Sequence, residues 1–271
     1  MIYELEQPSS TTLAIDCRFP EALAVIEGNN PGWVFVDDPN APKAALVWAQ
    51  GIEGFYLVGD ASRAAFPDAL DLHTDQVLKS RLRNLGVDRF EISGGEGWDP
   101  VIKNALRKQD LESSLQWVYT LKLAEQKTLT PPEVVDGCKL LRINPYLLVN
   151  LSVSNKQFLF SKLTHFWGSV DAFLNTGFGY VLVDEEEIAS LCCSGFVAGN
   201  IHAIDIETVQ SHRRKGYAET VARAFLAECI EKDLEPYWEC MAENTASSRL
   251  AEKLGFTQSH VYTLYSFSLQ A

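Results

Sequence analysis

The sequence has little positive charge and no long apolar run. Its 271 residues include 23 Lys and Arg against 36 Asp and Glu, which gives a formal net charge of −13. A field of this sign repels nucleic acids and anionic membranes, so neither is predicted as a partner, and it favours cationic small molecules. No apolar segment approaches the ~20 residues that span a bilayer, and residues 1–16 lack the apolar core of a signal peptide. The sequence therefore predicts a cytoplasmic protein.

Patterns typical of metal sites and disulfide frameworks are also absent. The chain has six cysteines, and none of them forms a CxxC pair. Cys192 and Cys193 are adjacent, so on a strand they would point to opposite faces of the sheet. The five histidines are scattered and show no ligand spacing. We therefore expect reduced thiols and no metal site.

The most informative stretch is 210–218, which reads Gln-Ser-His-Arg-Arg-Lys-Gly-Tyr-Ala. A strand-like alternating run precedes it at 201–209, and apolar residues recur at helical spacing across 219–232. The first turn of a helix has backbone N–H groups without internal partners, and the helix dipole makes that end positive. Gly216 lets a ligand approach the backbone, and the three basic residues before it add charge. This arrangement predicts a site for a phosphate or pyrophosphate.

Two common phosphate-binding motifs do not match this loop. A P-loop is excluded because the second glycine and the Lys-Ser/Thr pair are missing. A Rossmann fingerprint is excluded because the loop has one glycine where three are needed. An ordinary surface turn in front of an amphipathic helix stays open as an alternative.

A second informative stretch lies downstream. Residues 236–240 predict a short strand, and residues 244–254 predict a helix. Asn244 or Thr245 can cap the start of this helix, and Gly255 suits its C-terminal end. Capping alone would explain the asparagine.

The two stretches together resemble the GNAT acetyltransferase superfamily over residues 179–256. The phosphate-binding signature of that superfamily, Arg/Gln-x-x-Gly-x-Gly/Ala, is matched by Arg213, Gly216 and Ala218. The later helix of the superfamily is matched by Asn244, Leu250, Gly255 and Phe256. The resemblance implies an α/β (α+β) fold with a mixed, mostly antiparallel sheet flanked by helices. It also implies an N-acetyltransferase that uses acetyl-CoA as co-substrate and a primary amine of a small molecule as acceptor.

A narrower resemblance concerns one branch of the superfamily. Residues 204–208, and Trp238-x-Cys240 followed by Asn244 and Ser247, are similar to a branch that includes zwittermicin-resistance-type acetyltransferases.

The resemblance implies a cofactor site with three parts. Backbone N–H groups of the loop hold the pyrophosphate, the edge of the preceding strand pairs with the pantetheine arm, and the later helix contacts the cofactor. The predicted cofactor-binding residues are Ile206, Thr208, Val209, Arg213, Arg214, Lys215, Gly216, Tyr217, Ala218, Asn244, Ser247 and Ser248.

The general base of the reaction is predicted on the strand before the loop. Counting back from the signature arginine to the family's usual glutamate leads to His202, whose reference pKa is near neutrality. Glu207 and Asp205 are the other candidates. Strand alternation places His202 on one face and the two acids on the other.

The usual general acid is missing from the later helix. Many GNAT enzymes have a tyrosine where this chain has Ala251, so Tyr217, Ser248 or solvent would protonate the departing thiolate. This change keeps a second function open, namely an acyl-CoA-binding sensor or partner-binding protein with little or no turnover. A generic α/β protein with a phosphate-binding turn is a third alternative.

The order of predicted elements indicates two domains. Residues 1–125 are expected to form a smaller α/β domain, whose element order resembles a degenerate GNAT-like unit without the phosphate loop. A proline-containing linker follows at 126–133. Residues 134–271 are expected to form the acetyltransferase domain, which a final strand at 261–267 closes. Four acids at 184–187 predict a solvated hairpin tip.

Overall fold

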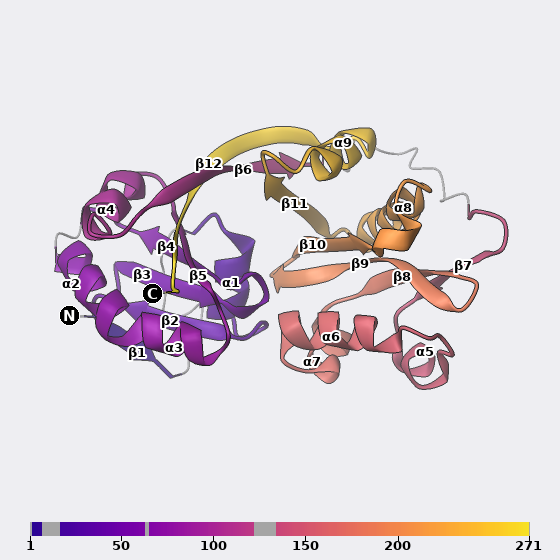
Figure 1. Cartoon of the computed structure of the whole chain (residues 1–271), viewed down its shortest axis with the longest axis horizontal. Helices are drawn as coiled ribbons and strands as arrows, with labels where there is room; N and C mark the ends of the chain where they lie inside the picture. The colour runs from indigo at the N-terminus through magenta and orange to yellow at the C-terminus, as the bar shows by residue number, and fades with distance from the viewer. Residues whose placement is uncertain (1, 7–16, 63–64, 122–133, 271) are drawn as a thin grey trace. The chain divides into compact units, whose positions relative to one another are not determined.

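The computed structural model describes residues 2–6, 17–62, 65–121 and 134–270 (Figure 1). Its chain divides into two compact units. Unit 1 comprises Met1–Trp117 and Val261–Ala271, and unit 2 comprises Val118–His260. None of the helices in the described ranges has the length and apolar character needed to cross a membrane. All six cysteines are free thiols.

Unit 2 is built on a mixed sheet. Its strands, in hydrogen-bonded order, are the end of β6 (Glu112–Thr120, of which residues 118–120 fall in unit 2), β11 (Glu235–Met241), β10 (Ile201–Thr208), β9 (Glu187–Ala198), β8 (Gly179–Asp184) and β7 (Cys138–Arg142). The pairs from β7 to β10 are antiparallel, and β10 pairs with β11 in parallel. Most of the pairing among these strands is therefore antiparallel, and the parallel pairing of β10 with β11 involves the first residues of β10, 201–203.

Helices cover both faces of the unit 2 sheet (Figure 1). They are α5 (Pro145–Asn150), α6 (Lys156–Trp167), α7 (Val170–Thr176), α8 (Tyr217–Glu231) and α9 (Thr245–Lys253). The core on the α8 face includes Phe178, which stacks on Phe225 at 4.5 Å between ring centroids. A bulge in β9 at Gly195 shifts its register against β10, but β10 keeps its alternation. His202 therefore faces α8, whereas Asp205 and Glu207 face α6.

Unit 1 is also a mixed sheet with helices. Its strands, in hydrogen-bonded order, are β1 (Tyr3–Leu5), β2 (Gly32–Val36), β3 (Ala44–Ala49), β4 (Gly54–Gly59), β5 (Arg89–Gly94) and β12 (Thr257–Ser268). Its helices are α1 (Pro20–Ile26), α2 (Ala65–His73), α3 (Lys79–Asn84) and α4 (Trp98–Ala105), with the π-helical turn η2 (Thr74–Leu78) joining α2 to α3. The predicted α/β class, with a mixed and mostly antiparallel sheet, is confirmed in both units.

The C-terminal strand completes unit 1. Residues 264–268 of β12 pair with residues 89–93 of β5, and Phe267 stacks on Phe90 at 4.9 Å between centroids. Phe90 stacks in turn on Phe55, also at 4.9 Å. The expected division placed this last strand in the second domain, whereas residues 261–271 fall in unit 1, where Phe267 joins an aromatic stack with residues far earlier in the chain. The predicted linker at 126–133 lies outside the described residues.

The two units share one order of elements. Each has a strand, one or more helices, three antiparallel strands, a helical segment, a strand parallel to the third strand, and a helix. A long strand follows in each case, β6 in the first half of the chain and β12 at its end. The third strand and its parallel neighbour are β4 and β5 in unit 1, and β10 and β11 in unit 2.

Candidate active site

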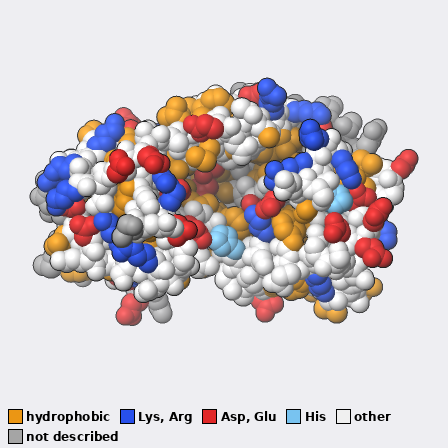
Figure 2. Space-filling view, in the orientation of Figure 1, with side chains coloured by type: hydrophobic (Ala, Val, Ile, Leu, Met, Phe, Trp, Pro, Cys, Tyr) orange, Lys and Arg blue, Asp and Glu red, His pale blue; other side chains and the backbone are white. Residues whose placement is uncertain are grey.

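A cavity of about 630 Å³ lies in unit 2 where β10, the loop after it, α8 and α9 meet. Most of the predicted cofactor-binding residues line it: Ile206, Thr208, Arg213, Arg214, Gly216, Tyr217, Ala218, Asn244 and Ser247. The three others, Val209, Lys215 and Ser248, are not among its lining residues. Figure 2 shows basic side chains gathered over α8 and α9, on a chain whose net charge is strongly negative. In the described ranges, no cluster of His, Cys, Asp and Glu is arranged to hold a metal.

One wall of the cavity is the edge of β10. The parallel pairing of β10 with β11 joins residues 201–203 to residues 235–237 and goes no further within the described structure. Beyond Ala203, the edge of β10 that faces β11 is therefore unpaired. Residues 206–208 of this edge line the cavity. An unpaired strand edge can hydrogen-bond an extended ligand, as the edge of a sheet does with an added strand.

The floor of the loop is the N-terminus of α8. Gly216 is the N-cap with φ of +83°, and a Cβ added there would meet no heavy atom within 4 Å. Arg214 also has a positive φ, +65°. In the described part of the chain, the backbone N–H groups of Gly216, Tyr217 and Ala218 have no acceptor. Free N–H groups at the positive end of a 15-residue helix are suited to an anion.

The basic residues of the loop have different environments. Arg213 Nε donates to the carbonyl oxygen of Thr208 at 3.2 Å, which closes the turn. Arg214 also lines the cavity, and its side chain has no ion pair within the described residues. Lys215 Nζ instead lies 3.2 Å from Asp184 Oδ2. The sequence predicted that all three basic residues add positive charge to the site, and the structure leaves Arg214 as the one most available to an anion.

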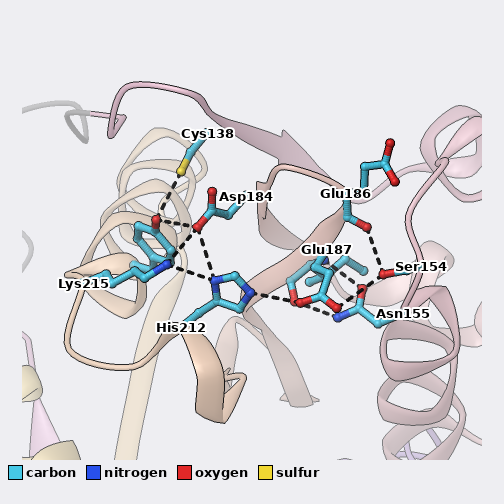
Figure 3. Close-up of polar contacts among 10 residues, drawn as sticks. Cys138, Ser154, Asn155, Asp184, Glu186, Glu187, His212 and Lys215 are labelled. Carbon is cyan, nitrogen blue, oxygen red and sulfur yellow. Dashed lines mark hydrogen bonds and ion pairs between the residues drawn. The ribbon is translucent and has the colours of Figure 1, made fainter.

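A polar network connects this loop to the β8–β9 hairpin (Figure 3). Asp184 Oδ2 accepts a hydrogen bond from Tyr217 Oη at 2.7 Å and lies 3.2 Å from His212 Nδ1. His212 Nε2 lies 3.1 Å from Glu187 Oε2. The hydrogen bonds from Tyr217 and Lys215 lower the pKa of Asp184 below its usual value. The four acids at 184–187 are thus more than the solvated tip expected from the sequence, because two of them anchor the loop.

Neither predicted acid hydroxyl is free of protein partners. Tyr217 Oη donates to Asp184 and accepts from Cys138 Sγ at 3.5 Å, and contacts with these two residues raise its pKa. Ser248 Oγ donates to the carbonyl oxygen of Thr245 at 3.2 Å. Ala251 is fully buried. These contacts favour solvent as the proton donor for a departing thiolate.

The start of α9 forms another wall of the cavity. Asn244 Oδ1 accepts from the backbone N–H of Ser247 at 3.2 Å, so the asparagine caps the helix as expected. Ser247 Oγ also accepts from Trp238 Nε1 at 3.0 Å, which fixes the first turn of α9 on β11. Capping therefore explains the position of Asn244. Because Asn244 also lines the cavity, it lies beside any ligand bound there.

His202 lies in the core of unit 2. Its side chain is buried, its ring contacts Phe178, and its Nδ1 is 2.8 Å from Ser194 Oγ. Burial, assisted by the charge of Lys232, lowers the pKa of His202 to about 4. It does not line the cavity. A neutral histidine in this position is poorly placed to accept a proton from an acceptor amine.

Glu207 and Asp205 share one cation on the opposite face of β10. Lys162 Nζ of α6 lies 2.7 Å from Glu207 Oε2 and 3.6 Å from Asp205 Oδ1. Glu207 lines the cavity and is partly exposed. Burial raises the pKa of Asp205, and its Oδ2 has no hydrogen-bond partner within the described structure. The sequence did not single out Lys162, because no local pattern indicates a contact between α6 and β10.

Comparisons with known proteins bear on the whole chain. The family model for GNAT acetyltransferase matches residues 20–265. The uncharacterized N-acetyltransferase YdfB of Bacillus subtilis (strain 168) is 30% identical over 245 residues, which cover 89% of this chain and 88% of the relative. Both matches extend through units 1 and 2.

Solved structures show the same fold. A GCN5-related N-acetyltransferase-like protein from Streptococcus suis 89/1591 matches with a TM-score of 0.65 and 21% identity, over 92% of this chain and 94% of that one. A tandem GNAT protein from the clavulanic acid biosynthesis pathway matches with a TM-score of 0.60 and 12% identity, over 100% and 99% of the two chains. The family model and the Bacillus relative decide the family, and the chain belongs to the GNAT acetyltransferases.

Proposed function

We propose that unit 2 binds acetyl-CoA in the cavity and transfers the acetyl group to a primary amine of a small molecule. One observation carries the proposal. The free N–H groups at Gly216 and the unpaired edge of β10 line the same cavity of about 630 Å³. A diphosphate and an extended amide-containing arm are the two chemical features that such a pair of walls can bind together.

In this proposal, each wall of the cavity holds one part of the cofactor. The N–H groups of residues 216–218 and the guanidinium of Arg214 hold the pyrophosphate. Residues 206–208 pair with the pantetheine arm, and the amide of Asn244 contacts the cofactor from α9. Lys215 contributes indirectly, because its ion pair with Asp184 fixes the loop. Asp184 is therefore a positioning residue for the loop.

Glu207 is the proposed general base, because it is the candidate that both lines the cavity and carries a carboxylate. The amine loses a proton to Glu207, directly or through a water, as its nitrogen attacks the acetyl carbonyl carbon. The C–S bond then breaks, and the CoA thiolate takes a proton from solvent. Lys162 Nζ lies 2.7 Å from Glu207 Oε2 and orients this carboxylate, and the same ammonium lies 3.6 Å from Asp205 Oδ1.

The acceptor is proposed to be a cationic amine. The chain carries a net charge of −13, and a second carboxylate, Asp205, lies near the proposed base Glu207 on the α6 face of β10. Cationic molecules are concentrated near such a surface, and anionic ones are repelled. Polyamines and aminosugars fit this description. The narrower resemblance to zwittermicin-resistance-type enzymes stays a prediction.

An acyl-CoA sensor with little turnover is the second candidate. The engaged hydroxyls of Tyr217 and Ser248, together with Ala251 at the usual acid position, favour it. The two functions differ in one measurement. CoA thiol release from acetyl-CoA is followed with a thiol reagent while a panel of polyamines, aminosugars and acidic amines is added. Amine-dependent thiol release supports the enzyme, and binding of acetyl-CoA without release under any amine supports the sensor. Turnover confined to anionic acceptors such as glutamate would overturn the proposed acceptor class.

A further inference from the structure

The face of α9 that lines the cavity extends well past its cap. Ala246, Ser247, Leu250 and Lys253 recur at helical spacing and all line the cavity. From Ala246 to Lys253 the helix rises about 10 Å, at roughly 1.5 Å per residue. The cavity therefore continues along α9 beyond the walls that the pyrophosphate and the pantetheine arm would use.

Lys253 ends this face with a positive charge that is held in place. Its Nζ lies 2.5 Å from Glu219 Oε2, in the first turn of α8. Glu219 Oε1 also lies 2.9 Å from Arg223 Nη2. Burial alone would raise the pKa of Glu219, but the two cations outweigh it and lower that pKa, so the carboxylate stays charged. One carboxylate between two cations leaves the cluster with a net positive charge.

The ammonium of Lys253 retains capacity for a ligand. A lysine has three N–H donors, and the contact with Glu219 uses part of that capacity. The side chain is 64% exposed, so a ligand in the cavity can reach it. Of the basic residues of the loop, Arg213 Nε is bound to the carbonyl of Thr208 and Lys215 is paired with Asp184. Arg214 is the residue proposed to hold the pyrophosphate. Lys253 is thus the cation that α9 presents to the cavity.

We infer that Lys253 binds the 3′-phosphate of CoA and makes the site selective for donors that carry it. The inference rests on the proposed function. With the pyrophosphate at Gly216 and the pantetheine arm on β10, the nucleotide end of the cofactor falls in the remaining part of the cavity, between Glu219 and α9. The 3′-phosphate is the anionic group of that nucleotide end, and the Lys253 cluster is the positive site there. The ligand class is a 3′-phosphorylated nucleotide thioester, as opposed to dephospho-CoA.

The test compares CoA with 3′-dephospho-CoA by isothermal titration calorimetry on the full chain. We expect wild type to bind CoA about tenfold more tightly, as suits one partly exposed charge-assisted contact. Lys253→Met should bring the ratio of the two dissociation constants within about twofold of one, while the dissociation constant for dephospho-CoA stays unchanged. Lys253→Arg should keep most of the preference. Lys139→Met removes the same charge from an exposed position on β7 and should leave the ratio at the wild-type value.

The outcomes separate this inference from the proposed function. Equal affinity of wild type for both ligands would overturn the inference and leave the proposed function standing, as would an undiminished preference in Lys253→Met. Binding of neither ligand to wild type would overturn both. Thermal unfolding of each variant, measured alongside, shows whether a change in affinity follows from loss of folded protein.

Discussion

The two units of this chain share an order of elements, and they differ at the point where unit 2 has its cavity. In unit 2, parallel pairing between β10 and β11 stops at Ala203 and Tyr237. In unit 1, the corresponding strands β4 and β5 pair up to Leu57 and Gly94, and the N–H of Gly95 adds a further bond to the carbonyl of Leu57 at 3.1 Å. The end of β10 is therefore left unpaired on its β11 side, whereas the corresponding end of β4 is paired with β5.

Trp98 completes the difference. It is the first residue of α4 and is fully buried, and its Nε1 donates to the carbonyl of Gly59, the last residue of β4, at 3.2 Å. A Cβ at Gly94 would lie 2.3 Å from Trp98 Cβ, so glycine is needed for the indole to pack there. In unit 2, the first residue of α9 is Thr245. An indole in unit 1 thus fills the region where unit 2 has a small polar residue.

The turns after the third strands also differ. In unit 1, Asp60 Oδ1 accepts from the backbone N–H and the hydroxyl of Ser62, both within 3 Å, which places a carboxylate where unit 2 has a basic loop. In unit 2, Gly216 leaves open space above free N–H groups. We therefore propose that unit 1 is a degenerate GNAT-like unit and that only unit 2 binds acetyl-CoA. A shared order of elements does not by itself reproduce a site.

The largest expected effect concerns the residue before the end of the third strand, which is Glu207 in unit 2 and Val58 in unit 1. Glu207→Gln should lower kcat by about 10²–10⁴-fold, the usual contribution of a general base. Binding of acetyl-CoA by calorimetry should be retained. The control is His202→Asn. We expect this variant to keep kcat within a fewfold of wild type and to be less stable, because the change disturbs the contact between His202 Nδ1 and Ser194 Oγ. A large loss of kcat in the histidine variant with normal activity in Glu207→Gln would reverse the assignment.

Removing the indole from unit 1 tests the other side of the comparison. Trp98→Ala should destabilise unit 1 by about 3–5 kcal/mol, because it empties a fully buried site and frees the carbonyl of Gly59. Urea unfolding monitored by circular dichroism measures this loss. The dissociation constant for acetyl-CoA should stay as in wild type wherever the variant is folded. A weakened affinity in folded Trp98→Ala would show that unit 1 contributes to the site.

An acidic residue in the unit 2 loop, like the one in the corresponding turn of unit 1, should weaken the binding of acetyl-CoA. Gly216→Asp places a carboxylate beside the proposed pyrophosphate position, where like charges a few ångströms apart repel by up to ~4 kcal/mol before screening. We expect at least tens-fold weaker binding of acetyl-CoA and near-normal circular dichroism. The matched control is Gly199→Asp, at φ of +56° and with equally open surroundings, in the β9–β10 turn. Equal affinities in Gly216→Asp and wild type would mean that the loop is only a turn.

The last expected effect is an acid sensitivity that Glu228 gives to unit 2. Glu228 of unit 2 is buried, and hydrogen bonds from Arg142, Lys232 and Tyr180 outweigh its burial and lower its pKa to about 2. This stabilisation is present above the unfolded pKa of about 4.5 and is lost as the pH falls from there towards 2. It amounts to about 3 kcal/mol, at roughly 1.4 kcal/mol per pKa unit. Calorimetric unfolding between pH 5 and 2 should show a steeper decline for wild type than for Glu228→Gln, and parallel curves would contradict the account.

The local parts of the site were predictable from the sequence. The loop and the cap of α9 depend on residues within a few positions of each other, so Gly216 and Asn244 could be identified from spacing alone. The alternation that separates His202 from the two acids also held, because the bulge lies in β9 and leaves β10 regular.

The non-local parts were not predictable. Asp184 contacts loop residues that lie 28 or more positions later in the sequence. Lys162 contacts Glu207 of β10 from α6. No local pattern indicates either contact, so Lys215 was expected to face the ligand and Lys162 was missed. The burial of His202 and the packing of Trp98 depend likewise on the tertiary structure. The partner of β12 is decided by an aromatic stack whose members lie far apart in the chain.

The most direct test of the comparison is the number of acetyl-CoA molecules that one chain binds. Native mass spectrometry of the full chain, at an acetyl-CoA concentration just above the wild-type dissociation constant, measures it. We predict one bound molecule per chain in wild type and in Trp98→Ala, and a much smaller bound fraction in Gly216→Asp at the same concentration. A second bound molecule that survives in Gly216→Asp, or none in wild type, would contradict it.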